Sequence, residues 1–220
     1  MKFDPAQILL MIPPVLLAIT MSEAARAYAA RYWGDNTAEK FGRLSLNPFV
    51  HIDLFGTVAV PLLLAFIGAP FLFGWAKPVP VNSRNLRDVR LGIRSIAAAG
   101  LLANLLMMYA WGLLLALLPV IPAAFREPFS GMAGYGITFN AVLFVLNALP
   151  VLPFDGGRII DTFLPAKYSV QFQKTARYGT WVVLILLLTG ILGYLILPLA
   201  AALSYTAYLP ATLIAALFLR

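Results

Sequence analysis

Long apolar runs recur along the chain and constrain its fold more than any other feature. Six are present, over residues 8–28, 55–75, 96–121, 137–152, 181–203 and 209–219. A helix needs about 20 apolar residues to cross a bilayer, so the third and fifth runs are long enough and the sixth is too short alone. The pattern predicts an all-α integral membrane protein with about four to six transmembrane helices in a single transmembrane domain over residues 1–220.

The composition supports the bilayer as the solvent. Hydrophobic residues make up 61% of the chain and charged residues 11%, whereas soluble domains are about 25% charged. The absence of cysteine excludes a disulfide framework, a thiolate metal site and a cysteine nucleophile. His51 is the one histidine, so a zinc site built on histidines lacks ligands. The net charge of +7 is not arranged as a nucleic-acid surface, and we expect no nucleic-acid partner.

The positions of the basic residues predict a topology. Twelve of the 16 Lys and Arg residues fall in three segments, at 31–52, 77–94 and 158–177. The positive-inside rule places all three segments in the cytoplasm. This requires residues 55–75 to enter the membrane and return as a re-entrant hairpin, which Pro61, Gly68 and Pro70 permit. The alternative, a kinked single span, stays open. The hairpin would bring the ends of the first and fourth helices to the same cytoplasmic depth.

Charged residues within or beside apolar runs are candidates for function, because their burial in a membrane is unfavourable. Glu23 and Arg26 lie three residues apart and would share one face of a helix. Asp53 and Asp155 flank other apolar runs, and Asp155 follows two prolines that interrupt a helix. A single histidine such as His51 is more often a hydrogen-bonded structural residue than a metal ligand.

Several blocks match one known family in order and spacing. They are Ser22-Glu23-Ala24-Ala25-Arg26-Ala27-Tyr28, Gly42-Arg43-Leu44-Ser45-Leu46-Asn47-Pro48, Ala99-Gly100-Leu101-Leu102-Ala103-Asn104, and residues 147–157 with Asn147, Pro150, Asp155, Gly156 and Gly157. The sequence resembles the site-2 protease family of intramembrane zinc metalloproteases over roughly residues 15 to 200. The first block aligns with the HExxH helix of that family, and the last resembles its NxxPxxxxDG signature.

The resemblance implies roles for individual positions. In active members two histidines and the Asp of the second signature hold zinc, and the Glu acts as general base on a zinc-bound water that attacks a transmembrane substrate. Here Glu23 stands at the general-base position and Asp155 at the third-ligand position. Ser22 and Arg26 replace the two histidines. The resemblance also implies a substrate cleft lined by His51, Asp53, Asn147, Pro150, Gly156 and Gly157.

The two replacements predict that no ordinary zinc site forms, because serine is a poor ligand and arginine does not deprotonate. We hypothesise that the Arg26 guanidinium instead serves as the counter-ion of Glu23 and Asp155. The expected function is that of a pseudoprotease without a cofactor, which binds a transmembrane protein or peptide segment in a prokaryotic cytoplasmic membrane. Two alternatives remain: a zinc endopeptidase, if the replacements are engineered or an unusual metal site forms, and a small transporter or channel. The sequence makes no prediction of oligomeric state.

Overall fold

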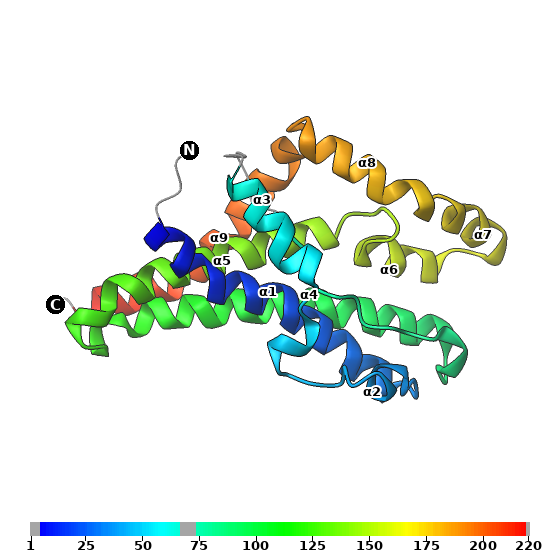
Figure 1. The fold of residues 1–220 in the computed structure, drawn as a ribbon, viewed down its shortest axis with the longest axis horizontal. Coiled ribbons are helices and arrows are strands. Elements are labelled where there is room, and N and C mark those ends of the chain that lie inside the picture. The colour runs from blue at the N-terminus through cyan, green and yellow to red at the C-terminus, as the bar shows by residue number, and fades with distance from the viewer. Residues whose placement is uncertain (1–4, 67–73, 219–220) are drawn as a thin grey trace.

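The computed structural model describes residues 5–66 and 74–218, and every regular element in these ranges is helical (Figure 1). The four longest helices are α1 (Pro5–Tyr32), α4 (Val89–Leu117), α5 (Ala123–Asn147) and α9 (Ile191–Phe218). Each contains a stretch long and apolar enough to cross a membrane. The all-helical fold class is therefore confirmed, with four candidate spans in the described part of the chain.

Shorter helices connect the long ones. They are α2 (Thr37–Lys40), η1 (Pro48–His51), the π-helical η2 (Leu54–Ala59), α3 (Val60–Phe66), η3 (Ser83–Asn85), η4 (Leu118–Val120), α6 (Asp155–Phe163), α7 (Ala166–Lys174) and α8 (Ala176–Leu188). Of these, α6 matters most for the site, because it packs against α4 and begins with Asp155.

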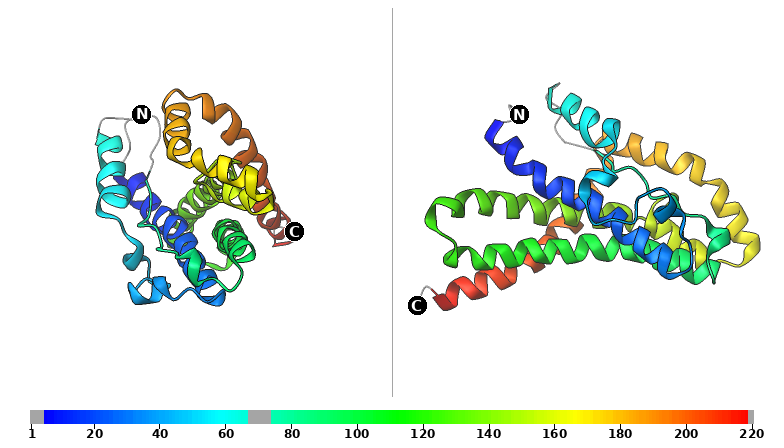
Figure 2. Two further views of the ribbon diagram at one scale, coloured as in Figure 1. Left: turned by 90° about the vertical axis from the view of Figure 1, so that its right-hand side faces the viewer. Right: turned by 60° about the horizontal axis from the view of Figure 1, so that its bottom comes forward.

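The core lies where α4, α5 and α9 meet, and α1 packs along α4 and α5 (Figures 1 and 2). Its fully buried side chains include Met108 of α4, Ile137 of α5 and Ala207 of α9. A Cβ added at Gly112 would lie 2.4 Å from the carbonyl oxygen of Ala207, so only glycine allows α4 and α9 to approach this closely. Small residues at helix crossings are typical of packing between transmembrane helices.

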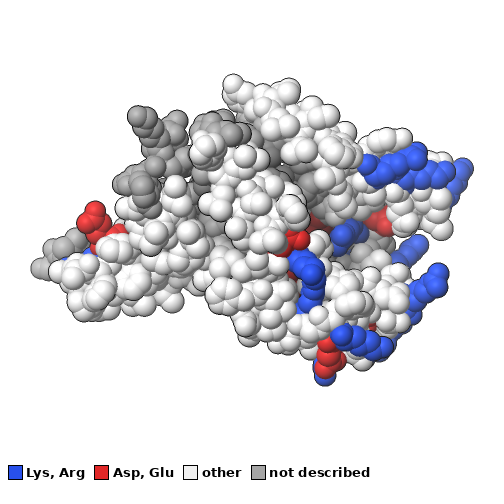
Figure 3. Space-filling model, viewed as in Figure 1, with Lys and Arg blue, Asp and Glu red and all other residues white. Residues whose placement is uncertain are grey.

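The three basic segments lie at one end of the bundle. Figure 3 shows that the Lys and Arg side chains on this face gather at the end that holds α2 and α7. Hydrogen bonds join the segments: an Nη1 of Arg43 donates to the carbonyl of Pro78 (2.9 Å), and Nε of Arg94 donates to the hydroxyl of Thr162 (3.1 Å). The prediction that residues 31–52, 77–94 and 158–177 share one side is therefore confirmed.

The chain leaves this end at Gly56 and returns to it at Trp75. The amide of Trp75 donates to the carbonyl of Gly56 (3.1 Å), and the hydroxyl of Thr57 donates to the carbonyl of Trp75 (2.8 Å). A single span would separate its two ends by about 30 Å. The kinked-span alternative for residues 55–75 is therefore wrong, and the returning arrangement agrees with the basic-residue pattern. Residues 67–73, which include Gly68 and Pro70, lie outside the described residues.

The predicted span at residues 181–203 is wrong in its limits. Helix α8 ends at Leu188, and Gly190 adopts a positive φ of 77° that breaks the helical path. Helix α9 then starts at Ile191 and continues to Phe218, so it absorbs the short run at 209–219. Pro198 and Pro210 lie inside α9 without ending it. A glycine within an apolar run does not interrupt the hydropathy pattern, so the pattern predicted one helix where the structure has two.

The other spans differ from their predicted limits in both directions. Helix α1 runs through Pro13 and Pro14, which transmembrane helices tolerate. Helix α5 begins at Ala123, well before the predicted start of the run at residue 137, and ends at Asn147 instead of 152. The first turns of α5 contain polar residues such as Arg126 and Glu127, so the helix starts before the apolar stretch on which the prediction was based.

Candidate functional site

The Arg26 guanidinium joins two carboxylates that are 132 positions apart in the sequence, on α1 and α6. Its Nη1 donates to Oε1 of Glu23 (2.5 Å), and its Nη2 donates to Oδ2 of Asp155 (2.5 Å). The side chains of Arg26, Glu23 and Asp155 are 9%, 17% and 4% exposed. The contacts that the counter-ion hypothesis requires are thus present. Paired, charge-assisted hydrogen bonds of this kind are among the stronger polar interactions in proteins.

Helix α1 supplies both partners of the first pair, because residues three apart on a helix lie on the same face. Asp155 reaches the pair from a different direction. It is the first residue of α6, where unpaired backbone amides and the helix dipole favour a negative side chain. Pro150 and Pro153 prevent α5 from continuing, so the chain turns between Asn147 and Asp155.

Three glycines allow this turn to fold tightly against α6 and α8. A Cβ on Gly156 would lie 2.1 Å from the carbonyl oxygen of Ala148, and one on Gly157 would lie 2.4 Å from the carbonyl carbon of Val151. On α8, a Cβ at Gly179 would lie 1.6 Å from the carbonyl oxygen of Leu152. These neighbours are backbone atoms that cannot rotate away. The glycines after Asp155 are therefore required to place its carboxylate.

Gly100 on α4 leaves the space that the guanidinium occupies. A Cβ at Gly100 would lie 2.5 Å from Nε of Arg26 and 2.6 Å from its Cζ. Nε itself is buried and has no hydrogen-bond partner in the described parts of the chain. Gly100 belongs to one of the sequence blocks that carry the family resemblance, but the resemblance implies no role for it. A glycine in the middle of a long apolar helix was the available signal.

The segment of residues 74–82, here called the crossing segment, contacts the site at the end of the bundle where the basic residues gather (Figure 3). The amide of Val79 donates to Oε2 of Glu23 (2.8 Å), so both oxygens of that carboxylate accept hydrogen bonds. The amide of Lys77 donates to the carbonyl of His51 (2.8 Å). Sequence reasoning missed Val79, because a backbone amide leaves no signature in the residue type.

The far end of the crossing segment is fixed by Asp35, which follows α1. Its carboxylate accepts hydrogen bonds from the amide and hydroxyl of Thr37, the amide of Asn82 and the side-chain amide of Asn85. Burial by itself would raise the pKa of Asp35, but these hydrogen bonds outweigh it and hold the pKa below its ordinary value. Ionised Asp35 thus fastens the segment that covers Glu23.

Other predicted cleft residues have local roles in the structure. His51 is fully buried and pairs through Nε2 with the carbonyl of Ser45 (2.9 Å). Asp53 caps η2 by accepting hydrogen bonds from the amides of Phe55 and Gly56. Asn147 donates to the carbonyl of Leu143 in its own helix (2.9 Å). None of the three has a hydrogen bond to the Arg26 cluster, and their assignment to a cleft stays a prediction.

Two bacterial proteins are similar to the chain along most of their length. It is 36% identical over 192 residues to the protein named "Putative zinc metalloprotease YwhC" of Bacillus subtilis, covering 86% of this chain and 84% of that protein. The chain belongs to the YwhC family. It is also 26% identical over 189 residues to "Putative zinc metalloprotease Rip2" of Mycolicibacterium smegmatis, covering 84% of this chain and 69% of the other. No family model and no solved structure matches the chain.

The names of these relatives agree with the site-2 protease resemblance, and they raise the question of whether zinc fits here. A protein zinc site takes three or four nitrogen, sulfur or carboxylate ligands. The described residues contain no group of three or more His, Cys, Asp or Glu side chains that could hold a metal ion. Ser22 is directed into its own helix, where its hydroxyl donates to the carbonyl of Ile19 (3.0 Å). The guanidinium of Arg26, which has no lone pair to offer, occupies the position between the two carboxylates. This donor set does not fit the zinc that the names of the two relatives imply.

Proposed function

We propose that this member of the YwhC family is a pseudoprotease that keeps the membrane fold and binds a transmembrane segment of another protein. The observation that supports this most directly is the Arg26 guanidinium between Glu23 and Asp155. In a zinc peptidase the metal neutralises nearby carboxylates and activates water. An arginine is also a counter-ion for carboxylates, with one positive charge where zinc has two, but it cannot lower the pKa of a bound water in that way.

The state of Glu23 supports the same proposal. A general base needs a free carboxylate oxygen within hydrogen-bond reach of the attacking water. Both oxygens of Glu23 are engaged, one by Arg26 and the other by the amide of Val79. Each oxygen keeps a second lone pair, but these contacts hold the carboxylate toward Arg26 and the crossing segment, and neither partner activates a water as a metal ion does.

The binding role rests on the retained architecture. Active members of the resembled family hold transmembrane substrates, and this chain keeps four apolar helices and the covered site at their charged end. We place the protein in the cytoplasmic membrane of a prokaryote, with the charged end in the cytoplasm, because the relatives are bacterial and the basic residues gather at that end.

Metal analysis of the protein purified in detergent after zinc supplementation tests the loss of catalysis. We expect much less than one zinc per chain. The double variant Ser22→His, Arg26→His restores two nitrogen ligands beside Asp155 and should bind about one zinc per chain, which the further change Asp155→Ala should remove. One zinc per unsubstituted chain that is lost on Asp155→Ala would refute the pseudoprotease and favour the peptidase activity in the names of the relatives.

A further inference from the structure

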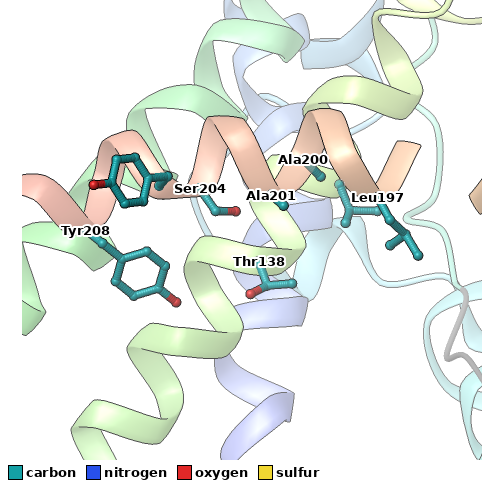
Figure 4. Close-up of a pocket in the computed structure, with 8 residues that line it drawn as sticks. Thr138, Leu197, Ala200, Ala201, Ser204 and Tyr208 are labelled. Carbon is teal, nitrogen blue, oxygen red and sulfur yellow. The ribbon is translucent and has the colours of Figure 1, made fainter. Parts of the chain in front are cut away.

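Away from the Arg26 cluster, a groove runs between α5 and α9 on the side of the bundle (Figure 4). It has a volume of about 470 Å³ and is lined by side chains of these two helices. Most of the lining is apolar, but hydroxyl groups of Thr138, Ser204 and Tyr208 face it. We call this feature the hydroxyl groove.

The hydroxyl groups in this groove lack the partners that such groups normally have. Ser204 is only 8% exposed and Thr138 lies at the exposed edge of the groove, yet neither hydroxyl has a hydrogen bond to another residue that the structure describes. Thr20, Thr206 and Thr212 behave differently, because each donates to a carbonyl three or four residues earlier in its own helix. Such back-bonding is the usual way to satisfy a hydroxyl in an apolar helix. The hydroxyl groups of Ser204 and Thr138 do not make this bond and face the groove instead.

The depth of the hydroxyl groove limits what can occupy it. Ser204 is at the centre of the 28-residue α9, and Thr138 is three residues past the centre of the 25-residue α5. At 1.5 Å per residue, both lie within about 5 Å of the middle of their helices. A phospholipid presents only hydrocarbon at that depth, because its polar groups lie about 15 Å away at the interface. A neighbouring transmembrane helix can present a polar side chain there.

We propose that the hydroxyl groove receives a transmembrane helix of a partner protein that carries a hydrogen-bonding side chain, such as Asn, Gln or Ser, at mid-membrane depth. Ala200 and Ala201 on the groove wall would let the two backbones approach closely, as small residues do at helix crossings. The inference rests on the proposed binding of a transmembrane segment, and it names the place on this chain and the chemistry of the partner.

Energy transfer between the labelled full chain and synthetic helices in lipid vesicles tests the proposal. The chain has no cysteine, so Glu127→Cys, exposed near the start of α5, provides one labelling position. The probes are an oligo-leucine helix with one central Asn, the same helix without Asn, and one with Asn moved toward its end. We expect the helix with central Asn to bind more tightly than both controls.

A matched set of variants connects this preference to the groove. Ser204→Ala with Thr138→Val removes both hydroxyl groups at nearly constant volume, and should weaken binding of the central-Asn helix about three- to tenfold. Thr212→Val, also on α9 but self-satisfied, should change nothing. Circular dichroism of each variant checks that the fold is retained.

Four outcomes would overturn the proposal. Equal binding of all three helices would show that hydrogen bonding is not what the groove recognises. Unchanged binding by the double variant would place the contact elsewhere on the chain and leave the proposed partner binding intact. Failure of every helix to bind would count against both the groove and the proposed binding of a transmembrane segment. Self-association that depends on Ser204 and Thr138, measured by transfer between differently labelled copies, would identify a second copy as the occupant.

Discussion

Replacing Arg26 by methionine removes the charge that joins Glu23 to Asp155 while keeping most of the aliphatic stem. The two carboxylates then remain buried with little compensation. Glu23 keeps one hydrogen bond from the amide of Val79, and Asp155 keeps the favourable field at the start of α6. We therefore expect Arg26→Met to destabilise the folded protein severely.

The magnitude follows from the burial of the two acids. Removing one member of a buried ion pair typically costs about 3–5 kcal/mol, because the other member is left as an uncompensated charge. Asp155, at 4% side-chain exposure, should account for most of this, since Glu23 is 17% exposed and better solvated. The free energy of unfolding should therefore fall by about 3–5 kcal/mol.

The assay is equilibrium unfolding in mixed micelles, followed by tryptophan fluorescence. Arg126→Met is the matched control, because Arg126 is exposed and, among the residues that the structure describes, donates only to backbone carbonyls at the opposite end of the bundle. It should change the unfolding free energy by less than about 1 kcal/mol. The triple variant Arg26→Met, Glu23→Gln, Asp155→Asn removes all three charges and should recover most of the loss, since neutral replacements of buried ion pairs are often tolerated.

Two results would refute this reasoning. An Arg26→Met protein within about 1 kcal/mol of the parent would mean that the guanidinium is not the required counter-ion. A triple variant as unstable as the single one would mean that Arg26 acts through packing, because removal of the stranded charges would then bring no benefit.

Two further predictions address the surroundings of the site. Gly100→Ala places a Cβ 2.5 Å from Nε of Arg26 and should lower the free energy of unfolding by about 1–3 kcal/mol in the same assay. Gly134→Ala is the control, because its Cβ would have one neighbour within 4 Å, the hydroxyl of Tyr208 at 3.9 Å, and it should be neutral or slightly stabilising. The lowered pKa of Asp35 means that its stabilising effect is present above the pKa of about 3.9 in the unfolded chain and is lost as pH falls through the lower folded-state pKa. Amide exchange at Asn82 should therefore be slow at pH 6 and accelerate on Asp35→Ala; equal rates in the two proteins would contradict this.

The sequence predicted the helical membrane fold well, because apolar runs of bilayer length have few other solutions. Its errors fall where a local residue overrides the hydropathy pattern. Gly190 separates α8 from α9 through a positive φ, yet it lies in a run that reads as continuous. The path of residues 55–75 was undecidable from composition, because proline and glycine permit both a kink and a return. The hydrogen bond between Trp75 and Gly56 settles it, and such a contact has no local sequence signal.

For the candidate site, the sequence predicted the charged residues and missed the backbone around them. Glu23 and Arg26 were paired by helical spacing, and Asp155 was joined to them by family resemblance and topology. Gly100 and Val79 could not be found in this way. The first contributes by lacking a side chain, and the second by an amide that every residue except proline possesses.

The balance of charge shows how the site can stay closed around Arg26. Two carboxylates and one guanidinium have a formal net charge of −1, whereas two carboxylates and a zinc ion would be neutral. The amide of Val79, the start of α6 and the partial exposure of Glu23 each stabilise the remaining negative charge. These compensating groups come from three parts of the chain: the crossing segment, α6 and α1. Because the arginine is part of the chain, the contact between α1 and α6 at this site forms without a metal ion, whereas a zinc site depends on the supply of zinc.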